Sequence, residues 1–341
     1  MRTTAVVIIL QLVLSGLAQS SNAQSAEIDA GWRKMFARES DPPAPPDNPL
    51  SLDKVTLGAK LFADARLSGT GDRSCASCLQ RERAFTVGRR RALGLSGASL
   101  RRNTPSLWNL AWGKHYFWDG RADSLEAQVG MPIEDVEELH GDWPTILRKL
   151  SDDAELRAGF KLAFPDDPLP SQTSVRKALA SYVRSLISPP TRFDAWIEGQ
   201  PQALQAAELR GFRLFTGTAA CVLCHVGWRF TDDRFHDVGL RSADAGRAAV
   251  PGGTPGLKAF KTPSLRELTL TAPYMHDGSL PTLSAVVAHY SGGFVSRPSL
   301  STQMNRDLRL STQERSDLLA FLRTLSSEEK AAPPRGAAGL R

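Results

Sequence analysis

The chain has 341 residues, of which 41% are hydrophobic and 23% charged, and its formal net charge is +6 at pH 7. These values are typical of an ordinary globular protein with room for two domain cores, and they exclude a disordered or fibrous chain. Aromatic residues are not interleaved with the basic ones, which argues against a nucleic-acid partner. The densest basic cluster, Arg89–Arg91 with Arg101 and Arg102, is interpreted as a solvated face, with docking of an acidic partner as the alternative.

The N-terminus has the pattern of a secretory signal peptide. Arg2 precedes an apolar run from Ala5 to Leu14, and small residues lead to a cleavage point after Ala23. The run is too short to span a bilayer comfortably, and no later segment could span one. We therefore expect residues 1–23 to be a signal peptide and the mature protein to be soluble and exported to the periplasm.

The next stretch, residues 24–49, contains the run DPPAPPDNP and is expected to be a proline-rich lead-in without folded elements. The first helix should begin near Asn48 as its cap, because Pro49 then takes the first helical position. After this helix, Gly69 to Ser74 is expected to be a loop that delivers Cys75.

Three further helices are expected toward the C-terminus. Residues 171–187 carry the clearest apolar stripe, and Pro189-Pro190 then marks a domain boundary. A second helix should cover about 201–215. Ser311 with Glu314 predicts a capping box at the start of a last helix. Strand-like alternation is scarce, so the fold class is mainly α with long loops.

The stretch Cys221-Val222-Leu223-Cys224-His225 is the attachment pattern of a c-type haem. Each thiol can add to one vinyl group of the porphyrin, and the next residue, His225, then lies below the iron as its proximal ligand. A zinc half-site or a disulfide is the alternative, although zinc would need two more ligands nearby. The remaining cysteines, Cys75 and Cys78, have the same spacing.

The chain repeats itself internally. Thr104-Pro105-Ser106-Leu107 aligns with Thr262-Pro263-Ser264-Leu265 at an offset of 262 − 104 = 158, and the match continues without a gap through both following segments. Such self-similarity indicates a duplicated unit. We expect two tandem cytochrome-c-like haem domains, at residues 50–188 and 189–326, followed by a disordered tail at 327–341.

These features resemble the bacterial di-haem cytochrome c peroxidase and MauG superfamily. The resemblance covers roughly residues 50–325 and rests on the paired cysteine motifs and on four further stretches: RNTP at 102–105, FWDGR at 117–121, FHDVG at 235–239 and APYMHDG at 272–278. It implies a peroxidatic haem in the N-terminal domain and an electron-transfer haem in the C-terminal domain.

The resemblance also implies roles for individual residues. Trp118 would lie between the haems and relay electrons, and a packed core tryptophan is the structural alternative. Glu138 and Gln128 match the residues that handle peroxide protons. Without the resemblance, Glu138 is only one member of an acidic surface run. A calcium ion would be held by the Asn103 side chain and by the carbonyls of Thr271 and Pro273.

The sixth ligand of the C-terminal haem distinguishes the branches of the superfamily: peroxidases place a methionine there and MauG a tyrosine. The register favours Tyr290, with Met275 as the rival ligand and a core tyrosine as the structural alternative. A phenolate is a hard anionic donor that stabilises ferric and higher states, whereas a thioether raises the potential. Tyr290 therefore favours the MauG-like branch, which oxidises a tyrosine or tryptophan of a partner protein.

The first motif departs from the family pattern because Leu79 replaces the histidine that should follow Cys78. Leucine cannot ligate iron, and rescue by His115 or His140 would require residues from other segments. Three interpretations remain open: a thioether-linked but weakly ligated haem, a Cys75–Cys78 disulfide without haem, or a sequencing or natural loss-of-function change.

The predicted function is that of an exported di-haem oxidoreductase that reduces hydrogen peroxide, and Leu79 predicts that this activity is impaired. Its electron donor would be a small cytochrome c or cupredoxin in the peroxidase interpretation, or a protein substrate in the MauG-like one. The alternative is a single-haem electron carrier or a vestigial, non-catalytic haem protein.

Overall fold

The computed structural model describes residues 30–252 and 258–327. The predicted signal peptide at 1–23 lies outside the described residues, as does all but the first residue of the predicted tail. The described chain is mainly helical, which confirms the predicted fold class, and its only two strands form one short antiparallel pair. No helix in the described ranges is both long and apolar enough to cross a membrane.

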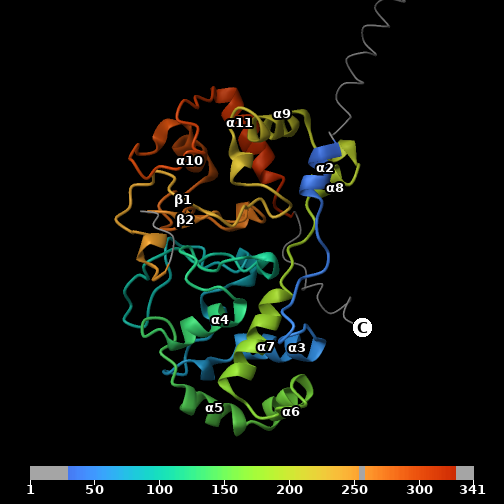
Figure 1. The fold of residues 1–341 in the computed structure, drawn as a ribbon, viewed down its shortest axis with the longest axis vertical. Helices are drawn as coiled ribbons and strands as arrows, with labels where there is room; N and C mark the ends of the chain where they lie inside the picture. The colour runs from blue at the N-terminus through green and yellow to red at the C-terminus, as the bar shows by residue number, and fades with distance from the viewer. Residues whose placement is uncertain (1–29, 253–257, 328–341) are drawn as a thin grey trace, which may run out of the picture.

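The structure has two halves, which lie one above the other in Figure 1. The lower half contains α3–α7, and the upper half contains α8–α11 with the strand pair and, unexpectedly, the N-terminal helix α2. The bounds are α2 Ala30–Phe36, α3 Leu52–Phe62, α4 Leu125–Glu134, α5 Trp143–Ser151, α6 Ala154–Ala163, α7 Gln172–Arg184, α8 Arg192–Ile197, α9 Ala206–Thr216, α10 Leu283–Ala288, α11 Thr312–Arg323, β1 Phe235–His236 and β2 Phe260–Lys261.

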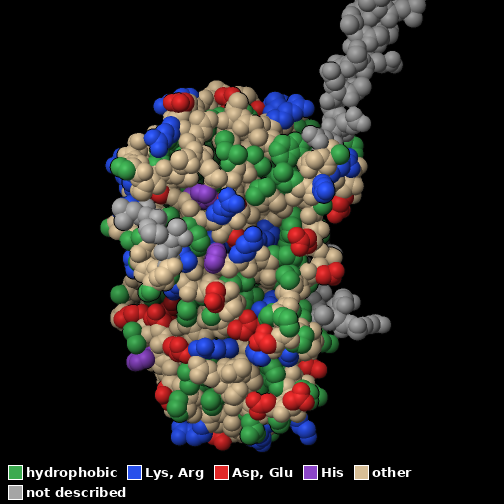
Figure 2. All heavy atoms as spheres, in the orientation of Figure 1, with side chains coloured by type: hydrophobic (Ala, Val, Ile, Leu, Met, Phe, Trp, Pro, Cys, Tyr) green, Lys and Arg blue, Asp and Glu red, His purple; other side chains and the backbone are tan. Residues whose placement is uncertain are grey.

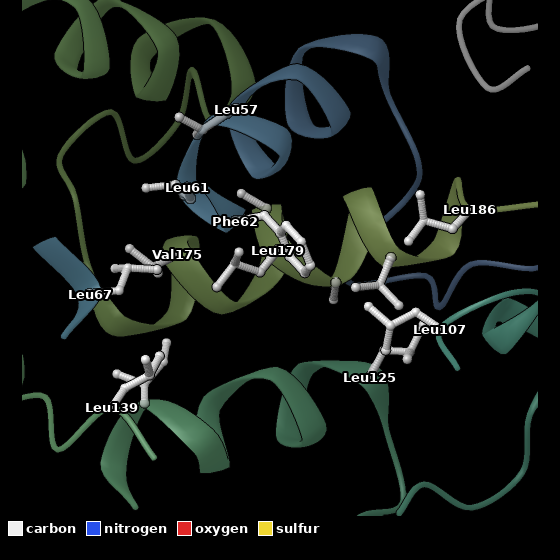
Figure 3. Close-up of a cluster of buried hydrophobic side chains, with 14 of the residues drawn as sticks. Leu57, Leu61, Phe62, Leu67, Leu107, Leu125, Leu139, Val175, Leu179 and Leu186 are labelled. Carbon is white, nitrogen blue, oxygen red and sulfur yellow. The ribbon is translucent and has the colours of Figure 1, made fainter. Parts of the chain in front are cut away.

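Each half has its own hydrophobic core. The lower core is built largely from α3 and α7, whose leucine and aromatic side chains face each other (Figure 3). The upper core is built from α9 and α11 together with the aromatic residues of α2 and α8. A hydrophobic core of its own is a defining feature of a domain, and each half has one.

The two cores use the same helix crossing. A Cβ atom added at Gly58 of α3 would lie 2.0 Å from the carbonyl oxygen of Ala178 in α7, and one added at Gly211 of α9 would lie 2.0 Å from that of Asp317 in α11. Glycine is required at both positions because the helix backbones touch there. The pattern Gly-x-x-Leu-Phe occurs at 58–62 and again at 211–215, each time ahead of a cysteine pair, so the duplication extends to the packing.

The start of the chain differs from the prediction. Residues 24–49 are not an unfolded lead-in throughout, because α2 forms and buries Phe36 in the upper core. Asn48 does not cap a helix: its side-chain amide is buried and donates to Glu126 at 2.7 Å. Ser51 caps α3 instead, by accepting a hydrogen bond from the Lys54 amide. The Asn48 side chain is therefore engaged in a tertiary hydrogen bond, which sequence periodicity cannot predict.

The remaining helix predictions agree more closely with the structure. The helix expected at 171–187 is α7, which has a capping box at Ser171 and ends at Arg184. The helix expected at 201–215 is divided into a 3-10 turn, Pro201–Ala203, and α9. The predicted capping box of Ser311 with Glu314 is confirmed at the start of α11.

Candidate functional site

The second cysteine motif forms a tight turn that presents His225. Cys221 begins a 3-10 turn, and the amide of His225 donates to the Cys221 carbonyl at 2.9 Å. The His225 Nδ1 lies 2.8 Å from the Phe230 carbonyl oxygen, so it must carry the proton and donate it there. This leaves Nε2 as the free ligand atom. Burial lowers the pKa of His225, which keeps the imidazole neutral and able to bind a metal.

A cavity of about 280 Å³ adjoins this histidine. Its wall is largely apolar and includes Cys221, Cys224, His225, Met275 and Tyr290. Five basic side chains also line it: Arg229, Lys258, Lys261, Arg266 and Arg297. An apolar slot with basic side chains on its wall matches a porphyrin with two carboxylates, so the residues present fit a haem attached to Cys221 and Cys224.

Tyr290 lies in an unusual turn at the end of α10. Residues His289–Gly293 form a π-helical turn, in which Gly292 has a φ of 96°. Burial raises the pKa of the Tyr290 phenol, and the two motif cysteines, Cys224 and Cys221, are its electrostatic neighbours. π-Helical turns often occur at functional sites. The rival Met275 also lines the cavity, from a loop where its φ is +72°.

The first cysteine motif has the same backbone but a different chemistry. The amide of Leu79 donates to the Cys75 carbonyl at 3.1 Å, as His225 does in the second motif. The Leu79 side chain packs against the lower hydrophobic core and offers no ligand atom. Cys75 and Cys78 are free thiols, so no disulfide joins them in the structure. The motif therefore fits attachment through two thioethers but does not supply a proximal ligand.

The two histidines considered as replacements lie elsewhere. His140 is exposed, and the ring of His115 lies 5.4 Å from the ring of Phe235 in the other half of the molecule. Neither histidine makes a hydrogen bond or ring contact with residues 75–79 in the described chain. The geometry thus gives no support to rescue by either one.

Glu138 lies near the first cysteine motif, whereas Gln128 lines the large cavity. Burial is the main reason that the pKa values of the Cys75 and Cys78 thiols are raised. The nearby charge of Glu138 raises them further. Burial, followed by the charge of Asp135, raises the pKa of Glu138 itself. Gln128 lines the large cavity from α4, and its buried Oε1 has no hydrogen-bond partner among the described residues. A buried, unpaired oxygen of this kind is expected where a ligand normally supplies the partner.

Trp118 lies at the boundary between the two halves and lines the cavity. Its indole Nε1 donates to the Asn103 carbonyl at 2.8 Å, and its own carbonyl accepts from the Lys261 amide of β2 at 2.8 Å. The residues that follow it are held by Arg247, which donates to the carbonyls of Asp119 at 3.0 Å and Gly120 at 2.6 Å. Contacts from both halves therefore fix this tryptophan.

The three residues expected to bind calcium line the same cavity. Asn103 is buried, and its side-chain amide donates to the carbonyls of Arg89 and Arg90, which leaves its oxygen for another partner. Thr271 and Pro273 flank Ala272, and the Ala272–Pro273 peptide bond is cis. Oxygen donors of this type suit a hard cation.

The structure corrects the interpretation of the basic cluster as a solvated face for Arg102, which is largely buried, whereas Arg89, Arg90 and Arg101 are exposed. Arg102 bridges two carboxylates, Asp119 and Asp244, and Arg101 also pairs with Asp244. Arg90 contacts Asp277 of the other half. These arginines join the two halves of the molecule. On the face shown in Figure 2, charges of both signs are interspersed and no single-sign patch stands out.

Sequence reasoning also missed the role of His236 in the FHDVG stretch. Its Nε2 lies 2.8 Å from an Asp232 oxygen, and Cys224, Asp232 and His236 place potential ligand atoms within 4.8 Å of one another. Although burial opposes it, the hydrogen bonds that the His236 ring donates to Asp232 and Cys224 raise the pKa of His236 to about 9. Because Cys224 is the thiol expected to carry haem, we interpret this group as part of the haem surroundings rather than as a separate metal site.

Comparisons with known proteins agree with this geometry. The sequence profile of a family described as di-haem cytochrome c peroxidase matches residues 52–202. The methylamine utilization protein MauG of Methylorubrum extorquens is 43% identical over 93% of this chain and 90% of its own length. The cytochrome c551 peroxidase of Nitrosomonas europaea is 31% identical over 86% of each chain. The crystal structure of a MauG-like protein associated with microbial copper homeostasis superposes with a TM-score of 0.80 at 34% identity, covering 89% of this chain and 97% of that one.

Proposed function

Because this chain belongs to the di-haem cytochrome c peroxidase and MauG family of oxidoreductases, we propose that it is a MauG-like member whose peroxide chemistry is weakened at the first motif. Haem c is the cofactor of this family, and hydrogen peroxide and a redox partner are the reactants that its peroxidases imply. The observation that carries the proposal is the position of Tyr290 on the wall of the same cavity that Cys221, Cys224 and His225 line.

At the second site, His225 and Tyr290 are the residues that would bind the haem iron. When bound, haem c supplies an iron that exchanges electrons with peroxide and with the partner. His225 presents Nε2 because Nδ1 is held by the Phe230 carbonyl. Tyr290 ligates as the phenolate, so it gives up its proton when it binds. A negative oxygen donor stabilises the oxidised site and disfavours electron uptake from a small cytochrome c or cupredoxin.

At the first site, the chain keeps its proton-handling groups but lacks the proximal ligand. Burial raises the pKa of Glu138, which favours the protonated carboxyl, and such a group suits transfer of a proton to and from peroxide. Gln128 would orient the reactant through its unpaired Oε1. Leu79 would leave a haem iron held at Cys75 and Cys78 without a ligand from this motif.

Trp118 is the proposed relay between the sites. It lines the cavity, and hydrogen bonds from both halves hold it in place. In a MauG-like reaction the final electron donor is a tyrosine or tryptophan of a partner protein, whose oxidation supplies the electrons that reduce peroxide. We further propose that Asn103, Thr271 and Pro273 bind calcium, and that the protein is exported to the periplasm.

The deciding experiment combines the haem-to-polypeptide ratio with a donor assay. We expect thioether-linked haem at Cys221 and Cys224, and a ferric spectrum that changes in Tyr290→Phe but not in Met275→Leu. Reduced cytochrome c with peroxide should be oxidised slowly. Rapid oxidation, together with a spectrum that depends on Met275, would contradict the MauG-like assignment.

A second function is favoured by Leu79. If only one haem is present per chain, the protein is a single-haem electron carrier descended from the enzyme. Reversible reduction of one haem without peroxide turnover, unchanged by Glu138→Gln, is the result expected for that carrier.

A further inference from the structure

The segment Asp237–Gly239, which follows β1, is one of the most firmly held loops in the upper half. The Asp237 carboxylate accepts hydrogen bonds from Arg297, at 2.7 Å from its Nε, and from the Ser299 hydroxyl at 2.6 Å. The Asp237 carbonyl accepts from the Ser301 amide at 2.9 Å. Asp237 is 3% exposed, so these bonds are shielded from water.

The turn that carries Tyr290 is attached to this segment at both of its ends. Before Tyr290, the His289 Nε2 donates to the Val238 carbonyl at 2.8 Å. After it, the Val295 amide donates to the Gly239 carbonyl at 2.8 Å. A third bond, from the Leu310 amide to the Ser291 hydroxyl at 3.1 Å, holds the middle of the turn.

External bonds matter here because the turn is weakly stabilised by itself. A π-helical turn is rare and usually occurs only as a single turn next to α-helical residues. Ser291 and Gly292 already depart from helical backbone angles. The position of the Tyr290 ring is therefore set by what the turn is attached to. His289 provides the side-chain bond that ties this turn to the Asp237–Gly239 segment, and its ring also contacts that of Tyr290 edge to face at 5.2 Å.

We propose that His289 is a positioning residue that holds Tyr290 over the second haem site through its bond to the Val238 carbonyl. This inference rests on the proposed ligation by Tyr290. Met275 belongs to a different loop, which is closed by the backbone pairing of Tyr274 with Leu280. Loss of the His289 bond would therefore loosen Tyr290 without moving its rival, and the site would open to an external ligand or to the thioether.

To hold the turn in this way, residue 289 must supply a hydrogen-bond donor where the His289 Nε2 lies. His289 is 7% exposed, so its removal would leave the Val238 carbonyl without a partner in a water-poor region. Glutamine can place an amide N–H near the same point, whereas phenylalanine keeps the ring volume and the contact with Tyr290 but has no donor. Comparing the two variants separates the hydrogen bond from packing.

The test uses the full-length haem-loaded protein and cyanide as the probe. His289→Phe should weaken the tyrosinate-to-iron charge-transfer band and raise the cyanide affinity of the second haem about tenfold, which corresponds to about 1.4 kcal/mol. His289→Gln should stay close to the parent protein. His140→Phe, at an exposed histidine, is the matched control and should change neither readout. Ser291→Ala removes another bond of the turn and should act in the same direction, which covers the case in which His289→Phe does not fold.

The outcomes separate this inference from the proposed function. If Tyr290→Phe abolishes the band while His289→Phe and Ser291→Ala leave the band and the cyanide affinity unchanged, His289 is not a positioning residue and the proposed function stands. If His289→Gln is as impaired as His289→Phe, the hydrogen bond is not the cause and the inference fails. If Tyr290→Phe itself has no effect on either readout, ligation by Tyr290 is wrong, and the inference falls with it.

Discussion

Trp118 and His276 occupy equivalent positions in the two repeats, and the backbone carbonyl of each is bound by the other half of the molecule. The Lys261 amide donates to the Trp118 carbonyl at 2.8 Å, and the Asn103 amide donates to the His276 carbonyl at 2.8 Å. The offsets are the same, 276 − 118 = 158 and 261 − 103 = 158. The halves therefore meet through a pair of equivalent backbone hydrogen bonds with approximate two-fold symmetry. The side chains at the two equivalent positions, Trp118 and His276, differ.

This symmetry shows where the duplicated halves have diverged. Tyr116 and Tyr274 both donate their hydroxyl hydrogen to a carbonyl six residues earlier, and both pair through their backbone with the residue six positions later. The scaffold is thus retained on both sides. Leu79 and His225 break the equivalence at the position that decides iron ligation.

Leu79→His should restore the first site. The Leu79 backbone already follows the geometry of His225, so the new imidazole would occupy the proximal position. We expect complete loading of a second haem and peroxide turnover about tenfold faster, equivalent to lowering the barrier by about 1.4 kcal/mol. Intact mass and stopped-flow kinetics measure the two effects. Leu79→Asn, which is polar but a poor iron ligand, is the control, and equal gains in both variants would contradict the explanation.

Gly58→Ala and Gly211→Ala should each destabilise one half. The added methyl group would meet a backbone carbonyl oxygen at 2.0 Å in both cases, and backbone cannot move aside as a flexible side chain can. We expect a loss of about 3 kcal/mol in the free energy of unfolding for each substitution. Gly159→Ala in α6 is the matched control, because its new methyl group would meet only the end of Leu57 at 3.2 Å. Denaturant unfolding that leaves the Gly58 and Gly211 variants as stable as the control would show that the helices can separate at no cost.

Asp244→Asn should weaken the contact between the halves in a pH-dependent way. Hydrogen bonds and charge from Arg102 hold the pKa of Asp244 well below its ordinary value of 3.8, despite the opposing effect of burial. A depressed folded-state pKa contributes stability above the unfolded-state pKa, and this stability is lost as the pH falls toward the folded value. The variant should therefore be about 2 kcal/mol less stable at neutral pH, and the difference should shrink below about pH 4.

Thermal unfolding of both proteins between pH 3 and pH 7 measures this effect. Asp166→Asn, at an exposed carboxylate, is the control and should follow the parent protein throughout. A stability difference that stays constant across this range would mean that Asp244 acts through shape rather than charge.

Phe36→Ala should destabilise the upper half, although Phe36 lies at the start of the chain. Its side chain is fully buried, stacks on Phe230 at 4.9 Å and meets Phe193 edge to face at 5.6 Å. Because Phe230 supplies the carbonyl that holds His225, we expect loss of about 4 kcal/mol and a perturbed spectrum of the second haem. Met35→Ala, at the exposed neighbouring position, should be close to neutral. A normal haem spectrum together with unchanged melting would refute the role of α2.

The sequence alone was sufficient for the fold class, the repeat and the chemistry of the second motif. Hydrophobic periodicity and capping residues are local signals, so α7 and the capping box of α11 could be predicted from neighbouring residues. The spacing of Cys221, Cys224 and His225 is likewise local, because a thioether pair and its proximal ligand must lie within one turn.

Only the tertiary structure decided what depends on residues far apart in the chain. Asn48 was predicted to cap a helix, but its buried side-chain amide donates instead to the half-buried carboxylate of Glu126. Arg102 was interpreted as solvated, but it bridges Asp119 and Asp244 across the two halves. The attachment of the Tyr290 turn through His289 has no sequence signature, since a hydrogen bond to a backbone carbonyl does not depend on the side chain of Val238. Local patterns specify elements, whereas burial and long-range pairing decide which polar groups remain free to act.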